Sequence, residues 1–458
     1  MSTTDEIATN GSTDDSTEDC IVVDAGYTQE THPESPIVNN ATYSFIWTSG
    51  LEYSNSTEEG YFEGFTIPQV HIGMHTIASI CPAFKQSNFL ALSKALGYGF
   101  AFMAGKVRTI HQGVLMMEII KHSHQRRTIY QRLDLLLTQP DTILETTRAT
   151  SSNDGYDAVI ILDYNSNPEC VERLRALASL SENWSRSGRR IRIFPHKEEL
   201  EWYHCKIKDI IALNELAYHA EETGKHGMAY RPLTCHGTEV CSLIGKETVI
   251  KASYSSETRH VRHLGVQRDP LLLCRLREED PQVEVDHADP HVYFHQETVH
   301  TLQTLGEFRV LITTVPNREA LRGREAHIVF MLCTSFNGSL ARTPFLPLSG
   351  SESFWGTIPP LDIDKLREYA VYIFNALRQR ADWREHFESL EVGVRLDIGV
   401  SPEDNCHRLF VNEITRFQQG NWFSTVDAPP HHQYPAALAR ALDAYFPTMT
   451  KSRRYSRS

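Results

Sequence analysis

The amino-acid sequence predicts a mixed α/β (α+β) protein, and three observations support this fold class. The chain has 458 residues, a length that usually folds as two or three domains. Residues 154–195 alternate strand, helix and strand patterns, which is typical of a parallel α/β unit. Residues 394–415 predict two short strands joined by a polar loop. The chain is therefore expected to combine helices and strands in more than one domain.

The N-terminal half contains the predicted α/β unit. Apolar residues recur at helical spacing in 89–105 and 113–137, which predicts two helices. The segment DAVIILDY (157–164) predicts a strand, PECVERLRALASLSENW (168–184) an amphipathic helix, and RRIRIFP (189–195) a second strand. This order predicts parallel strands connected by a helix.

The chain from residue 196 onward also mixes both kinds of element. Residues 196–220 and 362–383 predict helices, because their apolar residues follow helical spacing. Residues 247–254, 291–299 and 307–313 predict strands, because apolar and β-branched residues are concentrated there.

Charge is unevenly distributed along the chain. Residues 1–40 contain nine acids and no Lys or Arg, and removing those nine charges from the net −13 leaves −4. The first forty residues are expected to be disordered, and the nearly neutral remainder argues against nucleic acid as a main partner. No apolar run approaches the length of a membrane helix, and no secretory signal is visible, so a cytoplasmic protein without a membrane partner is expected.

Cysteine and histidine do not predict a metal or disulfide framework. The nine cysteines are scattered and form no CxxC pair, which favours reduced thiols. The His-rich segments HSHQRR (122–127) and APPHHQYP (428–435) lack the spacing of a closed metal site, so solvated loops are expected. The last residues, KSRRYSRS (451–458), form a short basic tail.

Two carboxylates in the hairpin suggest a metal site. Asp397 and Glu413 each lie among apolar residues, one in each strand, and an unpaired buried charge is costly. If the loop centre lies near Asn405, residue 397 falls opposite 412 or 413, with Cβ atoms roughly 5 Å apart. A hard divalent cation such as Mg²⁺ would offset the repulsion between them. The alternative is a half-exposed hairpin with chance acids.

Two lysines are candidates for binding phosphate. Lys251 ends an apolar strand, where it either neutralises phosphate oxygens or extends from a strand edge into solvent. The loop SYSSETRH (253–260) follows it and could cover phosphates with hydroxyl and N–H groups. Lys208 either binds phosphate or lies on the solvated face of a helix, and Lys206 competes for any role given to it.

The end of the strand at 291–299 could contact a purine nucleoside. Gln296 to Val299 can offer backbone N–H and C=O groups to a base edge. Glu307, ten residues after Glu297, can accept hydrogen bonds from ribose hydroxyls. The alternative is a hairpin with ordinary surface acids.

The candidate residues, taken in their order along the chain, resemble the ATP-grasp superfamily. The resemblance runs from about Lys206 to Phe417, nearly half of the chain. The matching features are a helix lysine, a strand-end lysine, HQETV, GEFRV, and RLDIGV followed by LFVNEI. The preceding α/β unit is similar to the preATP-grasp domain of that family. Together with the composition of the termini, the resemblance implies four parts: a disordered acidic tail (1–40), a preATP-grasp-like α/β domain (41–200), an ATP-grasp domain (201–448) and a basic tail (449–458).

The resemblance also implies a nucleotide-binding role for five residues. Lys208 and Lys251 would bind the phosphates of ATP. Glu297 and Val299 would contact adenine, and Glu307 would hold the ribose.

Five further residues would bind the acid substrate or the metal ion. Arg395 would orient the acyl phosphate or its carboxylate oxygen, and Arg309 would assist it. Asp397 and Glu413 would bind Mg²⁺, with Asn412 as a further candidate ligand.

Two departures from the family pattern bear on activity. The loop SYSSETRHV (253–261) lacks the usual glycines, and Thr415 stands where many members have an Asn ligand. Asn412 is nearby, but simple strand alternation puts it on the face opposite Glu413.

The expected function is an ATP- and Mg²⁺-dependent ligase. It would activate a small-molecule carboxylate as an acyl phosphate and join it to an amine, by analogy in specialised metabolism. One alternative is a catalytically degenerate ATP-grasp protein that binds nucleotide or serves in interactions. Another is an unrelated α/β protein without an ATP site. The sequence does not identify the acid, the amine or the oligomeric state.

Overall fold

The computed structural model describes these residues: 44–49, 127–141, 158–163, 168–203, 206–235, 243–252, 261–266, 293–334, 345–347, 363–417 and 433–446. Contacts divide the chain into Met1–Asn39 and Asn40–Ser458, and the described residues all belong to the second unit. Four predicted features lie outside them: the acidic tail (1–40), the helix at 89–105, the loop at 253–260 and the basic tail (449–458).

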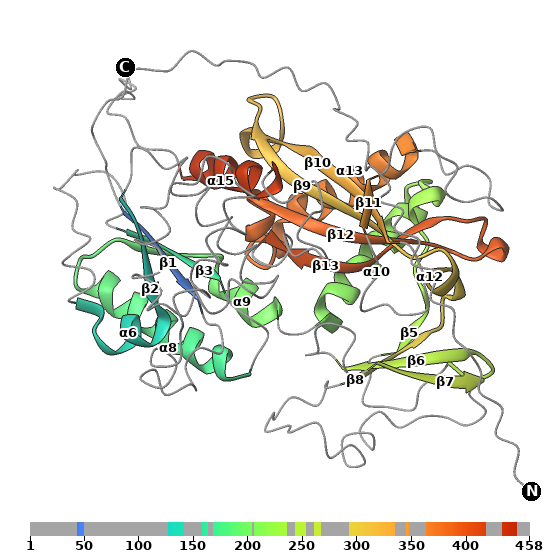
Figure 1. Ribbon diagram of the computed structural model, residues 1–458, viewed down its shortest axis with the longest axis horizontal. Helices are drawn as coiled ribbons and strands as arrows, with labels where there is room; N and C mark the ends of the chain where they lie inside the picture. The colour runs from blue at the N-terminus through green and yellow to red at the C-terminus, as the bar shows by residue number, and fades with distance from the viewer. Residues whose placement is uncertain are drawn as a thin grey trace, which may run out of the picture. The chain divides into compact units, whose positions relative to one another are not determined.

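A parallel sheet contains the predicted strand–helix–strand unit (Figure 1). Its strands run in the order β2 (Arg127–Arg132), β1 (Ser44–Ser49), β3 (Ala158–Asp163) and β4 (Ile191–Phe194). The neighbouring strands all pair in parallel. Helix α8 (Pro168–Arg186) connects β3 to β4, so this prediction is confirmed.

Helix α8 buries its apolar side with this sheet. Leu177 and Trp184 lie in one buried cluster with Ala158 and Ile160 of β3. The amphipathic pattern that predicted the helix therefore reflects burial of one side.

The prediction of one helix over 113–137 is wrong at its C-terminal end. Residues 127–132 form strand β2, and helix α6 (Leu133–Thr138) begins only after it. The segment RTIYQR contains β-branched and aromatic residues that suit a strand, and it pairs with β1 far away in the sequence. Helical spacing cannot report such a distant partner.

The carboxylate hairpin belongs to a second, antiparallel sheet. The order is β11 (Phe345–Pro347), β10 (Arg324–Thr334), β9 (Phe308–Pro316), β12 (Gly393–Val400) and β13 (Leu409–Arg416). The strands predicted at 307–313 and 394–415 are thus confirmed.

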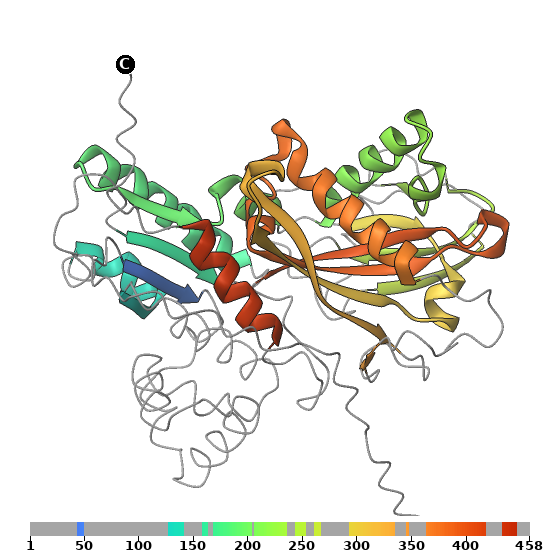
Figure 2. The same cartoon turned by 90° about the horizontal axis from the view of Figure 1, so that it is seen from above.

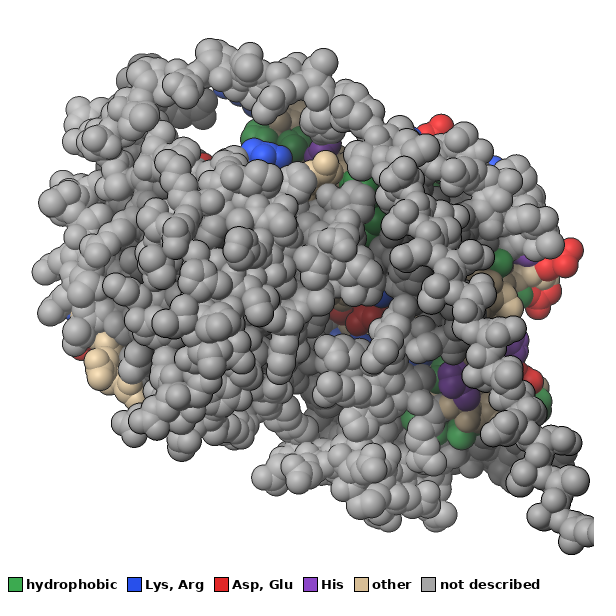
Figure 3. Space-filling model, viewed as in Figure 1, with side chains coloured by type: hydrophobic (Ala, Val, Ile, Leu, Met, Phe, Trp, Pro, Cys, Tyr) green, Lys and Arg blue, Asp and Glu red, His purple; other side chains and the backbone are tan. Residues whose placement is uncertain are grey.

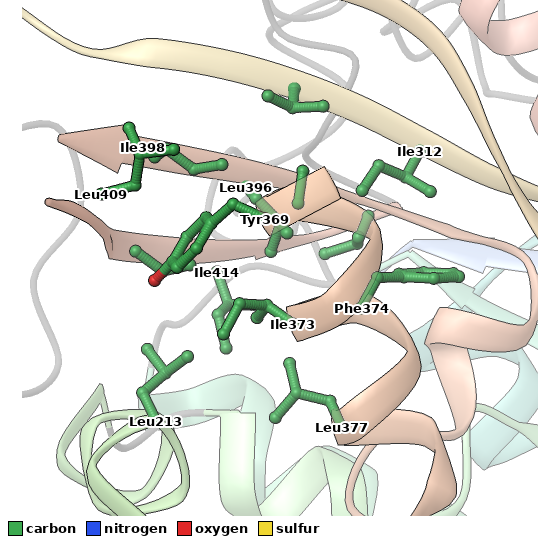
Figure 4. Packing of buried hydrophobic residues seen from close by; sticks show 14 of the residues in the cluster. Leu213, Ile312, Tyr369, Ile373, Phe374, Leu377, Leu396, Ile398, Leu409 and Ile414 are labelled. Atoms are coloured by element: carbon green, nitrogen blue, oxygen red, sulfur yellow. The ribbon is translucent and has the colours of Figure 1, made fainter. Parts of the chain in front are cut away.

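Two helices cover one face of this sheet. They are α10 (Lys206–Glu222) and α13 (Ile363–Gln379). Leu213 of α10 and Phe374 of α13 belong to the same buried cluster as Leu396 of β12 (Figure 4). Because side chains alternate along a strand, the neighbours of Leu396 on β12 face the other side of the sheet, where the candidate site lies.

The predicted helix at 196–220 is two helices, α9 (Lys197–Tyr203) and α10. Glu199 of α9 and Asp209 of α10 both bind the guanidinium of Arg416. In one continuous helix, these carboxylates would be about 15 Å apart along the axis. The interruption between α9 and α10 allows both to reach the same cation.

A third sheet contains the remaining predicted strands. Its order is β5 (Thr234–Cys235), β8 (Tyr293–Glu297), β6 (Glu247–Ala252) and β7 (Val261–Val266), all antiparallel. The other described elements are η1 (His226–Met228), α12 (His300–Thr304), η2 (Leu321–Gly323), η4 (Ala381–Trp383), η5 (Glu388–Glu391), η6 (Glu403–Asn405) and α15 (Gln433–Tyr445). Within the described residues, no helix combines the length and apolar character that a membrane span requires.

Helix α15 packs on the face of the second sheet opposite α13 (Figure 2). Gly393 of β12 allows this close approach. A Cβ atom on Gly393 would lie 2.5 Å from Leu438 of α15 and 2.7 Å from the carbonyl oxygen of Ile312.

Gly393→Ala is therefore expected to lower the free energy of unfolding by about 1–3 kcal/mol, because the backbone of Ile312 cannot yield as a side chain can. Urea denaturation measures this effect. Gly265→Ala is the matched strand control, since its new Cβ would meet no atom within 4 Å, and equal losses in both variants would contradict the packing argument.

Candidate functional site

A β-bulge shapes the carboxylate hairpin. Asp397 pairs with Glu413, one of the two partners that the sequence predicts, but the next residue, Ile398, pairs with Val411. Asn412 is therefore the extra residue on β13, and the bulge interrupts the alternation of its side chains.

The bulge corrects the prediction that Asn412 faces away from Glu413. The Asn412 side-chain amide donates a hydrogen bond to Glu307, and both Glu413 and Asp397 act electrostatically on Glu307. Asn412 and Glu413 are both half-buried. Asn412 and Glu413 therefore both act on Glu307, Asn412 by a hydrogen bond and Glu413 by its charge.

Asp397 is held by two arginines. Nε and Nη2 of Arg395 donate to its two carboxylate oxygens at 2.8 and 2.9 Å, and Nε of Arg309 lies 3.8 Å from Oδ1. Asp397 is only 1% exposed. Arginines on β12 and β9 therefore already offset the charge of this buried acid, and the metal-binding role of Asp397 stays a prediction.

Thr415, at the position of the expected Asn ligand, contacts the same arginine. Its hydroxyl oxygen accepts a hydrogen bond of 3.1 Å from Nη2 of Arg395. Thr415 and Arg395 are also cross-strand partners. This threonine therefore fixes the guanidinium that holds Asp397.

Glu413 is paired with Lys206. The ammonium of Lys206 lies 3.2 Å from Oε1 of Glu413. Burial alone would raise the pKa of Glu413, but the charges of Lys206 and Arg395 hold this pKa at about 2. Glu413 is therefore ionised at neutral pH and remains a good oxygen donor for a hard cation.

Lys208 is not brought to Glu413. It lies two residues beyond Lys206, about 200° further around helix α10. Its charge acts on His386, whose pKa is lowered by burial and, to a smaller degree, by Lys208. Of the two lysines, the structure thus places Lys206 at the carboxylates and Lys208 near His386.

Lys251 of β6 lies within electrostatic reach of Glu307 and Glu413. Its ammonium donates a hydrogen bond of 3.0 Å to Gln296. Burial lowers the pKa of Lys251 to about 8, with a further lowering by Lys206, while Glu307 and Glu413 oppose the shift. Lys251, Lys206 and these two glutamates therefore form one electrostatic group.

Glu307 lies at the carboxylate end of the site. Burial raises its pKa, and the nearby charge of Asp397 raises it further, whereas Arg309 and Asn412 oppose the shift. These neighbours belong to β9, β12 and β13. The structure thus associates Glu307 with Asp397 and Asn412.

The predicted adenine-binding residues lie at the end of strand β8 and just after it. The Glu297 carboxylate lies 2.9 Å from the ammonium of Lys246 and accepts a 3.4 Å hydrogen bond from the hydroxyl of Tyr230. The Glu297 N–H donates to the carbonyl of Leu233. The protein itself therefore already uses both the side chain and the N–H of Glu297.

Val299 lies in an apolar cluster beside the hairpin. It is 5% exposed and packs with Tyr230, Phe410 and Leu302. The rings of Tyr230 and Phe410 meet edge to face at 5.5 Å. This cluster provides an apolar wall of the kind that an aromatic base can contact.

Basic and acidic side chains nearly balance in the site. Four cations (Lys206, Lys251, Arg309 and Arg395) accompany three carboxylates (Glu307, Asp397 and Glu413). Figure 3 shows acidic side chains beside basic ones near the middle of the face drawn in Figure 1. A slight positive excess suits an anionic ligand.

The donor set fits Mg²⁺ in chemistry. Asp397, Glu413 and the amide of Asn412 supply hard oxygen atoms, and Mg²⁺ usually takes one or two carboxylates together with substrate phosphates. The described residues contain no group of three or more His, Cys, Asp or Glu side chains arranged to hold a metal. The site is therefore not a closed protein cage for a cation.

Arg416 and its partners were not predicted from the sequence. Its guanidinium binds Asp209 through two nitrogens, at 2.8 and 2.9 Å, and Glu199 through a third, at 2.9 Å. Asp209 lies on α10 one turn after Lys206. The sequence offered one signal: Arg416 is a charged residue at an inward position of a strand that is otherwise rich in apolar residues.

Comparisons with known proteins give distant similarities. No family model matches the chain, and no curated protein does. Among solved structures, the chain is similar to D-cycloserine synthetase DcsG, with 11% identity, a TM-score of 0.38, and coverage of 72% of this chain and 94% of that one. It is also similar to D-alanine–D-alanine ligase from Bacillus anthracis, with 11% identity, a TM-score of 0.38, and coverage of 88% and 95%. Because these similarities are distant, function is inferred from the side chains themselves.

Proposed function

We propose that this chain is an ATP- and Mg²⁺-dependent ligase of the ATP-grasp type that joins a small-molecule carboxylate to an amine. The observation that carries the proposal is the order of groups along one face of β12. Gly399 packs against Phe410 and Leu302 at one end of this face. Asp397, which pairs with Glu413, lies in the middle, and Arg395 lies toward the other end.

This order suits an extended nucleotide. Alternate residues of a strand are about 7 Å apart, so about 13 Å separates Gly399 from Arg395. Adenine would contact Val299 at one end, and the phosphates would lie over Asp397 and Glu413. The acid substrate would then meet Arg395.

The side chains supply what phosphoryl transfer needs, namely alignment and charge stabilisation. Lys251 and Lys206 would bind phosphate oxygens, and Arg395, assisted by Arg309, would bind the acid. The substrate carboxylate would attack the γ-phosphate, giving ADP and an acyl phosphate. The amine would then attack the acyl carbon and release phosphate.

The proposal changes two roles that the family resemblance implies. Lys206 takes the phosphate-binding role of Lys208, because it is the lysine that meets Glu413. Glu307 supports the carboxylate end in place of the ribose, because it binds Asn412. Asp397, Glu413 and Asn412 are the residues that would hold Mg²⁺, which neutralises phosphate oxygens when bound.

A second candidate function is nucleotide binding without turnover. The contacts of Asp397 favour it, because Arg395 already donates to both of its oxygens. MgATP binding without ADP release over a broad panel of acids and amines would support this alternative.

The test of the proposed function has two steps. A thermal shift with ATP and Mg²⁺ reports binding, since a ligand that binds only the folded state raises stability. An ADP-release screen over pairs of amino acids then reports turnover. Absence of any MgATP-dependent stabilisation would refute both candidate functions.

Lys206→Ala is expected to weaken MgATP binding by about tenfold or more, because a charge-assisted contact to phosphate is lost. Lys208→Ala is the matched control on the same helix and should leave the affinity unchanged. Isothermal titration measures both. The reverse ranking would restore Lys208 to the phosphate-binding role.

MgATP affinity is expected to fall as the pH rises through about 8, where Lys251 loses its charge. Below that pH the ammonium is protonated and attracts phosphate, and above it the amine is neutral. Lys251→Arg should remove this dependence, because guanidinium stays protonated. Titrations on either side of pH 8 measure the effect, and an unchanged pH profile in the arginine variant would assign it to another group.

A further inference from the structure

The side chain of Tyr434 is buried, and its hydroxyl is a polar group that the proposed function does not use. The residue is 0% exposed and lies near the start of helix α15. Its hydroxyl has no hydrogen-bond partner among the described residues. A buried polar group without a partner lowers stability, so such a group calls for an explanation.

Helix α15 brings Tyr434 to the arginine side of the site. Leu438, one turn after Tyr434, packs over Gly393. Gly393 and Arg395 share one face of β12, since they are two residues apart. Arg395 is also the charged group that acts on Tyr434, opposing the rise in its pKa caused by burial.

We propose that the Tyr434 hydroxyl is a substrate-binding group that donates a hydrogen bond to an oxyanion held by Arg395. That oxyanion is the carboxylate of the acid substrate and, later in the reaction, the acyl phosphate or released phosphate. This inference rests on the proposed function and adds a residue from outside the resembling segment 206–417.

The chemistry of the three neighbouring groups fits an oxyanion. Arg395 supplies a permanent charge, Thr415 fixes its guanidinium, and Tyr434 supplies a neutral donor. Because burial raises the pKa of Tyr434, its hydroxyl keeps its proton at neutral pH. The bound oxyanion would give this hydroxyl the acceptor that the described residues do not provide.

The test uses inorganic phosphate as the probe, so the acid substrate need not be known. Phosphate is titrated calorimetrically into the full chain saturated with MgADP. Tyr434→Phe is expected to weaken phosphate binding by about tenfold or more, while MgADP affinity stays unchanged. The melting temperature of this variant should be unchanged or higher, because an unpartnered polar group is removed.

Tyr445→Phe is the matched control on the same helix. Its hydroxyl donates a 2.7 Å hydrogen bond to Glu388, so this variant should melt at a lower temperature and bind phosphate normally. Equal phosphate affinity in Tyr434→Phe and the unmodified protein would overturn the inference and leave the proposed function standing. A wild-type protein that binds MgADP but no phosphate would overturn it as well. Failure of the wild type to bind MgADP would instead refute the proposed function.

Discussion

Glu413→Ala and Lys251→Ala are each expected to reduce ADP release by about 10²–10³-fold, the effect of removing one preorganised group that stabilises transition-state charge. Glu413 is the ionised acid that Lys206 holds in place. Lys251 is the cation that extends from β6 toward the same acids. The measurement is steady-state ADP release with the acid and amine pair found by the screen.

The control is Glu403→Ala, at the exposed turn of the same hairpin. It removes a glutamate far from the paired carboxylates and should keep full activity. Melting temperatures of all three variants show whether the fold is intact. Turnover that survives both Glu413→Ala and Lys251→Ala would exclude the assigned site.

The register of the carboxylate hairpin could be predicted because its information is local. A polar loop between two apolar strands sets the hairpin centre, and counting outward places residue 397 opposite 412 or 413. The bulge at Asn412 could not be counted in this way, because alternation assumes an uninterrupted ladder of pairs. That one inserted residue reverses the expected orientation of Asn412.

Other errors come from partners that are distant in the sequence. Helical spacing separates Lys206 from Lys208 onto different faces, but it cannot say which face meets β13. Likewise, residues 127–132 become a strand through pairing with β1. The neutralisation of Asp397 was partly accessible, because Arg395 and Asp397 share a strand face. The contribution of Arg309 required the neighbouring strand to be known.

Arg416→Met is expected to lower the free energy of unfolding by about 3–5 kcal/mol, the typical cost of removing one partner from a buried ion pair. Arg416 and Glu199 are each only 1% exposed. Methionine keeps part of the packing volume near the ring of Phe387, which lies 4.8 Å from the guanidinium carbon. Urea denaturation measures the loss. Arg367→Ala, which breaks an exposed pair with Asp364, should change stability by less than about 1 kcal/mol.

The pH dependence of this loss separates charge from packing. Burial already raises the pKa of Glu199, to about 7, and of Asp209, while Arg416 opposes both shifts. Without Arg416, both pKa values should rise further, so the folded state binds more protons than the unfolded chain between the unfolded and folded pKa values. Stability of Arg416→Met should therefore fall as the pH rises through about 7, and the loss should be smaller in mild acid.

Adding Glu199→Gln and Asp209→Asn should recover most of the loss, because amides cost less to bury than carboxylates. A loss that is independent of pH and remains in the triple variant would instead assign the role of Arg416 to packing on Phe387.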